Sequence, residues 1–178
     1  MMFYTRIILK TTDNLEDILR RLGAVKKHDF SFYDLVYLNK DGSSITDDTL
    51  KVRVYRYNEW NSKAVLVIRK RAEVVNGVKE DKFLIREEFD TEKEALEYVE
   101  ENFKDTFDYQ FKLEKSGEEY QNDDLRIWVE DIKDMGMSIE FGSESQEKIE
   151  DAIKLFDVQE RLTLSVPEYL YKKLKGEK

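Results

Sequence analysis

Alternating apolar and polar residues predict that much of this chain forms β-strands. The clearest case is the stretch 50–71, LKVRVYRYNEWNSKAVLVIRKR, in which two runs rich in Val, Ile, Leu and Tyr flank a polar turn at 58–63. Because successive side chains of a strand point to opposite faces, Lys51 and Arg53 share one face of the first strand, and Arg69 shares a face of the second with two valines. Cations on a face otherwise suited to burial predict either a cavity for an anion or a basic outer face in water.

The same patterns predict further strands and four helices. The strands are expected at 3–10, 30–39, 82–89, 106–114, 120–130 and 136–141. The helix starts are expected at Thr12 or Asp13, at the capping boxes Thr91–Glu94 and Ser165–Glu168, and at Ser143 or Ser145. We also expect a turn at Ser116 and Gly117, and a polar loop around His28.

This order of elements predicts an α+β fold in which antiparallel strands form a barrel or a strongly curved sheet, with helices packed outside on Ile7, Leu9 and their equivalents. The opposite face would line the interior with Arg6, Ile8, Lys10, Lys51, Arg53, Arg69 and Lys112. An unpaired buried charge is very costly. Either the interior is therefore a wet tunnel that holds acidic side chains and anions, or the assignment of faces is wrong on some strands.

Composition restricts the function classes. The 178 residues, of which 40% are hydrophobic, predict a single domain over 1–178 with a substantial core. The net charge of -9 argues against nucleic-acid and membrane-surface binding, so an anion site must be a local concentration of Lys and Arg. The lack of cysteine excludes thiol chemistry, and the single histidine excludes multi-histidine metal sites. The sequence has no membrane-length apolar run and no signal-peptide pattern, so we expect a cytoplasmic protein.

Five segments, taken in order, resemble the CYTH, or triphosphate tunnel, family. They are LKVRV, LVIRK, IREEFD, VEDIKDMGMSIEFG and SVPEYL. They are similar to the family's Leu-Arg-Ile-Arg, Leu-Thr-x-Lys and Arg-Glu-Glu strands, its Leu-Asp-x-Val-x-x-Leu-Gly-x-Phe-x-Glu-Ile-Glu signature and its closing Ser-Tyr-x-Glu-Leu-Leu segment. The resemblance implies an eight-stranded antiparallel β-barrel with flanking helices. In this family, which includes class IV adenylate cyclases and thiamine, inorganic and RNA triphosphatases, tunnel cations bind a triphosphate and carboxylates hold Mg²⁺ or Mn²⁺.

The resemblance also implies roles for particular residues. The phosphate-binding positions correspond to Lys10, Lys51, Arg53, Arg69 and Lys112, with Lys115 as a further candidate. The metal-binding positions correspond to Glu130 and Glu140, and Glu88 is a substitute ligand. Catalysis would depend on Lys10, Glu130 and Glu140.

The sequence departs from the family at the acids. The hallmark Glu-x-Glu-x-Lys of the first strand is replaced by Arg6-Ile7-Ile8-Leu9-Lys10, and Gly142 stands at the second glutamate of the signature. Hard divalent cations need carboxylate oxygens, so this loss should cripple ordinary family catalysis. The remaining acids either substitute for the lost ones or pair with tunnel cations; they are Glu88, Asp90, Glu114, Glu130 and Glu140.

Three functions follow as alternatives. The first is a divergent tunnel enzyme, a divalent-metal-dependent triphosphatase for a nucleoside triphosphate, an organic triphosphate or polyphosphate. Class IV cyclase activity is the least supported branch, because no base for a 3′-hydroxyl is visible. The second is a catalytically inactive module that binds a phosphorylated metabolite or nucleotide, with Arg6 in place of the metal charge. The third is a scaffold or interaction protein. We expect a small-molecule partner, and a homodimer stays open.

Overall fold

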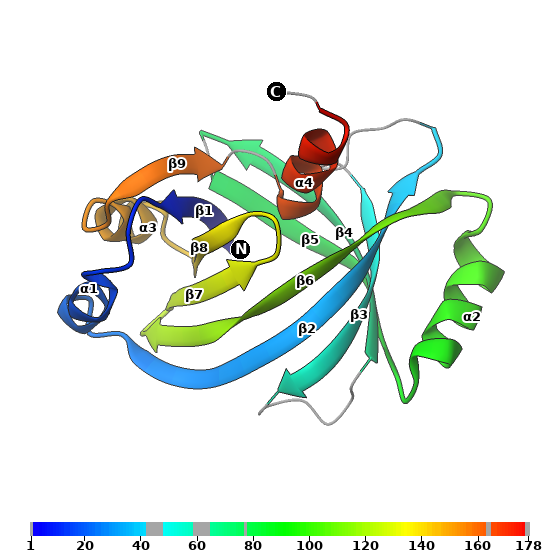
Figure 1. Ribbon diagram of the computed structural model, residues 1–178, viewed down its shortest axis with the longest axis horizontal. Coiled ribbons are helices and arrows are strands. Elements are labelled where there is room, and N and C mark those ends of the chain that lie inside the picture. The colour runs from blue at the N-terminus through cyan, green and yellow to red at the C-terminus, as the bar shows by residue number, and fades with distance from the viewer. Residues whose placement is uncertain (1, 42–47, 59–64, 77, 163–164, 177–178) are drawn as a thin grey trace.

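The computed structural model describes residues 2–41, 48–58, 65–76, 78–162 and 165–176. Within them the chain forms nine strands and four helices (Figure 1). The strands are β1 (Phe3–Leu9), β2 (Val25–Asn39), β3 (Thr49–Asn58), β4 (Val65–Val75), β5 (Val78–Phe89), β6 (Phe107–Asn122), β7 (Leu125–Ile132), β8 (Gly136–Ser143) and β9 (Val158–Leu162). The helices are α1 (Leu15–Arg21), α2 (Glu92–Phe103), α3 (Gln146–Ile153) and α4 (Val166–Leu174).

The strands form one antiparallel sheet in the order β5-β4-β3-β2-β6-β7-β8-β1-β9. The first two residues of β1, Phe3 and Tyr4, also pair with Glu80 and Lys79 of β5. An antiparallel sheet with flanking helices is therefore confirmed, but among the described residues the sheet has nine strands, not the expected eight. The additional strand, β9, is VQERL, in which Gln159 and Glu160 are both exposed and Leu162 is buried, so it lacks the alternation that would have predicted a strand.

Three helices cover the outer face of the curved sheet. Side chains of α2 pack on Leu50 and Val52 of β3 and on Val65 and Val67 of β4. Helices α1 and α3 pack on a second cluster that contains Ile7 and Leu9 of β1, and also Ile127, Ile139 and Phe141. The predicted outer position of Ile7 and Leu9 is confirmed, and the alternate side chains of these strands point inward.

The C-terminal helix α4 packs against the other face of the sheet. Its residues Val166 and Leu170 are buried together with Val36, Leu38, Leu113 and Ile132. Figure 1 shows α4 on the opposite side of the sheet from α2. The interior therefore has an apolar part, which α4 covers, beside the charged part that is described below.

The predicted turn at Ser116 and Gly117 is wrong, because both residues lie inside the continuous strand β6. A Cβ atom at Gly117 would lie 2.2 Å from the carbonyl oxygen of Val129 on β7 and 3.1 Å from the Cζ atom of Phe30. Glycine is therefore needed here for the close approach of neighbouring strands. The chain reverses instead after Asn122, where Asp123 has a φ of 51°.

Local helix signals were more reliable. The side-chain oxygens of Thr91 and Ser165 accept hydrogen bonds from the backbone N–H groups of Glu94 and Glu168, both at 3.2 Å, which confirms Thr91 and Ser165 as N-caps. The predicted loop around His28 is wrong, since this residue lies in β2. Most of the predicted turn at 58–63 falls outside the described residues. No helix in the described part of the chain has the length and apolar character to cross a membrane.

Candidate functional site

A cavity of about 210 Å³ lies against the inner face of the sheet. Among the described residues, five cationic side chains from four strands line it: Arg6, Lys51, Arg53, Lys70 and Lys115. Its aromatic lining consists of Tyr4, Phe30, Phe32, Tyr55, Phe83 and Trp128. Fixed cations beside aromatic faces suit an anionic ligand that also carries an apolar or planar group.

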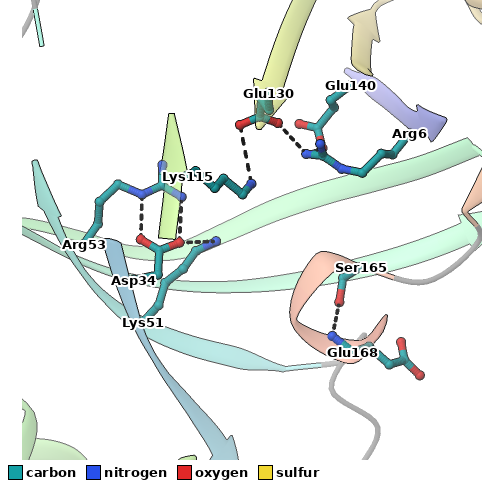
Figure 2. A network of polar contacts seen from close by, with 9 residues as sticks. All are labelled: Arg6, Asp34, Lys51, Arg53, Lys115, Glu130, Glu140, Ser165 and Glu168. Carbon is teal, nitrogen blue, oxygen red and sulfur yellow. Dashed lines mark hydrogen bonds and ion pairs between the residues drawn. The ribbon is translucent and has the colours of Figure 1, made fainter. Parts of the chain in front are cut away.

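One group of charges at the cavity wall, which includes the lining residues Lys51 and Arg53, is centred on Asp34 of β2. Arg53, its cross-strand partner on β3, donates from Nε and Nη2 to the two carboxylate oxygens at 2.8 and 3.0 Å. The Nζ atom of Lys51 lies 3.6 Å from the same carboxylate (Figure 2). Burial opposes the charge of Asp34, but Arg53 and Lys51 outweigh it and lower the pKa of this carboxyl to about 2. Asp34 is therefore an anion at neutral pH and fixes both cations.

A second group of charges is centred on Arg6 of β1. Its Nη2 atom lies 2.7 Å from a carboxylate oxygen of Glu130 and 2.7 Å from one of Glu140, and Nη1 donates to the hydroxyl of Ser138 at 2.8 Å. Figure 2 shows the guanidinium between the two carboxylates. Burial disfavours the charge of Arg6, but the two carboxylates hold its pKa above the ordinary value. One buried guanidinium therefore joins β1, β7 and β8.

Lys115 of β6 lies near Glu130 on the side away from Arg6. Its Nζ atom is 3.6 Å from the second carboxylate oxygen of Glu130, and its side chain is 10% exposed. Burial lowers the pKa of Lys115 to about 8, while attraction to Glu130 acts in the opposite direction. The carboxylate of Glu130 is thus shared between a guanidinium and an ammonium group.

Comparison with solved structures shows the same fold in other proteins. The PH1819 protein from Pyrococcus horikoshii OT3 has a TM-score of 0.75 at 18% identity, covering 97% of this chain and 99% of that one. The PH1012 protein from the same organism has a TM-score of 0.72 at 13% identity, covering 93% and 96%. The adenylyl cyclase candidate HpAC1 from Hippeastrum, described as revealing a dominant triphosphatase activity, has a TM-score of 0.65 at 14% identity, covering 100% and 97%. The chain has the CYTH fold. No family model and no curated protein matches the sequence.

Five of the residues that the resemblance selected meet in the cavity of this CYTH fold. Lys51 and Arg53 reach it from β3, Lys115 from β6, and Glu130 and Glu140 from β7 and β8. Strand alternation explains this result, because Lys51 and Arg53 are two residues apart and therefore share the inner face.

The other four selected residues lie outside the cavity. The interior position predicted for Lys10, Arg69 and Lys112 is therefore wrong. Lys10 follows the last residue of β1, is 59% exposed and lies 3.6 Å from Asp157. Arg69 donates to both carboxylate oxygens of Asp48, on the face of β4 that α2 covers. Lys112 is exposed on the outer face of β6. Glu88, which had been assigned as a substitute metal ligand, is also exposed.

The errors follow the alternation of side chains. Lys70, next to Arg69, shares the inner face with Ile68 and lines the cavity. Lys115 is three residues from Lys112 and therefore points to the opposite face. The short family motifs do not determine which of several nearby cations on a strand faces inward.

The sequence interpretation missed Asp34, although a signal for it was present. Asp34 interrupts a face of β2 on which Phe32 and Val36 are apolar, and its exposed fraction is 1%. A carboxylate at such a position must have a cationic partner. Arg53 on the adjacent predicted strand was the candidate partner.

Mg²⁺ or Mn²⁺ does not fit the donor set of this CYTH fold. Glu130 and Glu140 both contact Arg6, which is a monovalent cation with no lone pair to offer a metal. No cluster of three or more His, Cys, Asp or Glu suited to a metal occurs among the described residues. At Gly142 a Cβ atom would lie 3.0 Å from ring atoms of Tyr4 and Trp128, so aromatic rings fill the space beside the position of the missing glutamate.

Proposed function

We propose that the cavity binds a phosphorylated small molecule through Lys51, Arg53, Lys70 and Lys115. The observation that carries the proposal is the convergence of five cationic side chains on one cavity in a protein whose net charge is -9. Buried cations are costly, so a fold that gathers them gains from an anion that completes their coordination.

The lysines of the cavity suit a phosphorylated ligand. Lys51 and Lys115 line the cavity, and each also lies 3.6 Å from a carboxylate that contacts a guanidinium. An ammonium group has three donors, and phosphate oxygens form charge-assisted hydrogen bonds with such donors. Because Arg53 lies 3.9 Å above the ring of Phe32, its position is held by both an ion pair and an aromatic ring.

On the basis of the CYTH fold, we propose more specifically that the ligand is a nucleoside triphosphate, another organic triphosphate or polyphosphate. The description of the Hippeastrum protein supports this choice. The aromatic lining favours an organic triphosphate over bare polyphosphate, because a planar group would stack on it. The pairing of β1 with β5 supports our further proposal that the strands from β5 to β1 close into a tunnel.

Hydrolysis of the triphosphate is the second candidate function. Its support is the triphosphatase activity named for the Hippeastrum protein. The contacts of Glu130 and Glu140 with Arg6 weigh against a metal-dependent reaction here. We therefore place binding before hydrolysis.

The test measures the thermal unfolding midpoint with inorganic triphosphate and with ATP, each in EDTA and in Mn²⁺. A ligand that binds only the folded state stabilises it by about 2.7 kcal/mol at a hundredfold excess over its Kd. For a chain of this length we expect the midpoint to rise by roughly 5–10 °C in EDTA. ATP should produce a larger rise than inorganic triphosphate if the aromatic lining contacts the base.

Matched lysine variants locate the effect. Lys51→Met removes a cation from the cavity and should abolish most of the ligand-induced rise. Lys112→Met removes an exposed cation from the outer face and should leave the rise unchanged. No rise with either ligand would reject the proposal and favour the scaffold function. A rise that requires Mn²⁺ would favour the metal-dependent triphosphatase.

A further inference from the structure

We infer that Arg6 occupies the position of a divalent cation and, together with Lys115, supplies its charge, so that the anion site works without metal and the guanidinium prevents Mn²⁺ from binding Glu130 and Glu140. The inference rests on the proposed function for its biological meaning, because it concerns the same cavity. The exclusion of Mn²⁺ by Arg6, however, is a property of the protein without a phosphorylated ligand and can be tested separately.

The first support is the geometry around one nitrogen atom. The Nη2 atom of Arg6 contacts an oxygen of Glu130 and an oxygen of Glu140, each at 2.7 Å. Those two oxygens are therefore separated by at most twice that distance. Two carboxylate oxygens that converge on one point are the start of a site for Mg²⁺ or Mn²⁺, whose bonds to oxygen are about 2.0–2.2 Å long. In this protein the point of convergence is a nitrogen of the chain itself.

The second support is the balance of charge. Two carboxylates whose oxygens contact the same atom repel each other unless a cation lies between them. Arg6 and Lys115 both contact Glu130, and together they carry two positive charges, the same total as a divalent metal ion. The exposed fractions of Arg6, Lys115 and Glu130 are 5%, 10% and 6%, so solvent screens these charges only weakly.

The third support is the way that the backbone positions Arg6. Arg6 and Glu140 are directly paired residues of β1 and β8, and Glu130 is directly paired with Ser138 across β7 and β8. Ser138 accepts a hydrogen bond from the other terminal nitrogen of the guanidinium, Nη1. The strand register therefore brings the guanidinium to both carboxylates, and the hydroxyl fixes its orientation.

The test measures Mn²⁺ binding by calorimetry and by electron paramagnetic resonance in buffer without phosphate. Wild-type protein should bind no Mn²⁺ at this site. In Arg6→Ala we expect the affinity for Mn²⁺ to rise by about tenfold or more, because the repulsive charge is gone while both carboxylates stay. Mn²⁺ should also raise the unfolding midpoint of Arg6→Ala by several degrees and leave that of wild type unchanged.

Three variants serve as controls. Arg6→Ala combined with Glu140→Gln should lose the Mn²⁺ response, which would place the ion at these carboxylates. Arg161→Ala removes a guanidinium that donates to Glu150 at 2.9 Å, so it loses an arginine without freeing a pair of carboxylates, and it should gain no Mn²⁺ site. Arg6→Gln retains an amide donor and replaces Arg6→Ala if the smaller side chain prevents folding.

Two results would overturn the inference. One is a Mn²⁺ site in wild-type protein that disappears in Glu130→Gln or Glu140→Gln, because the guanidinium would then not exclude the metal. The other is a folded Arg6→Ala or Arg6→Gln protein with no Mn²⁺ response. Neither result depends on whether a phosphorylated ligand binds, so failure of the proposed function is recognised separately by the triphosphate and ATP measurements.

Discussion

At the scale of single residues, two buried carboxylates of the interior are each shared by two cations. Asp34 contacts Arg53 and Lys51, and Glu130 contacts Arg6 and Lys115. Removing one member of such a group leaves the others buried without compensation. These residues therefore hold neighbouring strands together as well as form the proposed binding site.

We predict that Asp34→Asn lowers the free energy of unfolding by about 3 kcal/mol at neutral pH, because it breaks a buried charge pair. The difference from wild type should shrink as the pH falls. The pKa of Asp34 is about 2 in the folded protein, and unfolded aspartate has an ordinary value of about 3.9, so its stabilisation is complete above the higher value and is lost toward the lower one. Urea unfolding at pH 7, 4 and 3 measures this change.

The control for Asp34 is Asp108→Asn. Asp108 is 61% exposed and lies 3.6 Å from Lys40, so its replacement should change stability by less than about 1 kcal/mol. Equal losses in the two variants, or a loss in Asp34→Asn that does not depend on pH, would contradict the charge-sharing interpretation.

Whether a site residue could be predicted from the sequence depended on how clearly its strand showed which face the side chain points to. Lys51 and Arg53 were placed correctly because they share a face on a strand with clear alternation. Arg69 and Lys112 were misplaced because moving a position by one or three residues reverses the face to which it points. Strand alternation alone could not assemble the Arg6 cluster, since Arg6 is 132 residues from Ser138 and 134 from Glu140 and meets them only through strand pairing. The resemblance to the family, by contrast, had suggested Arg6 in place of the metal charge and Glu130 and Glu140 as metal ligands.

At the scale of single elements, signals between residues close in sequence predicted structure well. Contacts between residues far apart in sequence could not be predicted. The N-cap hydrogen bonds of α2 and α4 join residues three positions apart, and both N-caps were predicted. The Ser116–Gly117 pair has the composition of a turn, yet it lies within β6 because both residues pair with β2 and β7. The glycine permits the close approach of Val129 and Phe30. Strand β9 was missed for a related reason, since its conformation comes from pairing with β1.

We predict that Gly117→Ala lowers the free energy of unfolding by roughly 2–4 kcal/mol, because a Cβ atom 2.2 Å from a backbone carbonyl forces β6 and β7 apart. Ser116→Ala, at the exposed adjacent position of the same strand, should cost less than about 0.5 kcal/mol. Urea unfolding of both variants measures the difference. A similar small cost for each would mean that the strands do not approach closely at Gly117.

At the scale of the whole molecule, the sheet has its charged residues inside and much of its apolar surface outside. The outer face is buried by α1, α2 and α3, and this arrangement leaves the inner face available for Arg6, Lys51, Arg53 and their partners. The overall charge of -9 surrounds this basic interior. A small anion that enters the cavity meets cations, whereas an extended polyanion meets mainly the acidic exterior.

We therefore predict that the protein does not bind nucleic acid, even at low salt. Non-specific DNA binding depends on surface lysines and arginines that displace counterions, and it reaches a Kd of about 10⁻⁴–10⁻⁶ M in proteins built for it. The test is fluorescence anisotropy with a labelled DNA duplex and with a labelled single strand. The anisotropy should not change even at protein concentrations well above the Kd for the small anion. Binding that weakens steeply between about 50 and 200 mM salt would contradict the prediction, because it would require a basic surface outside the cavity.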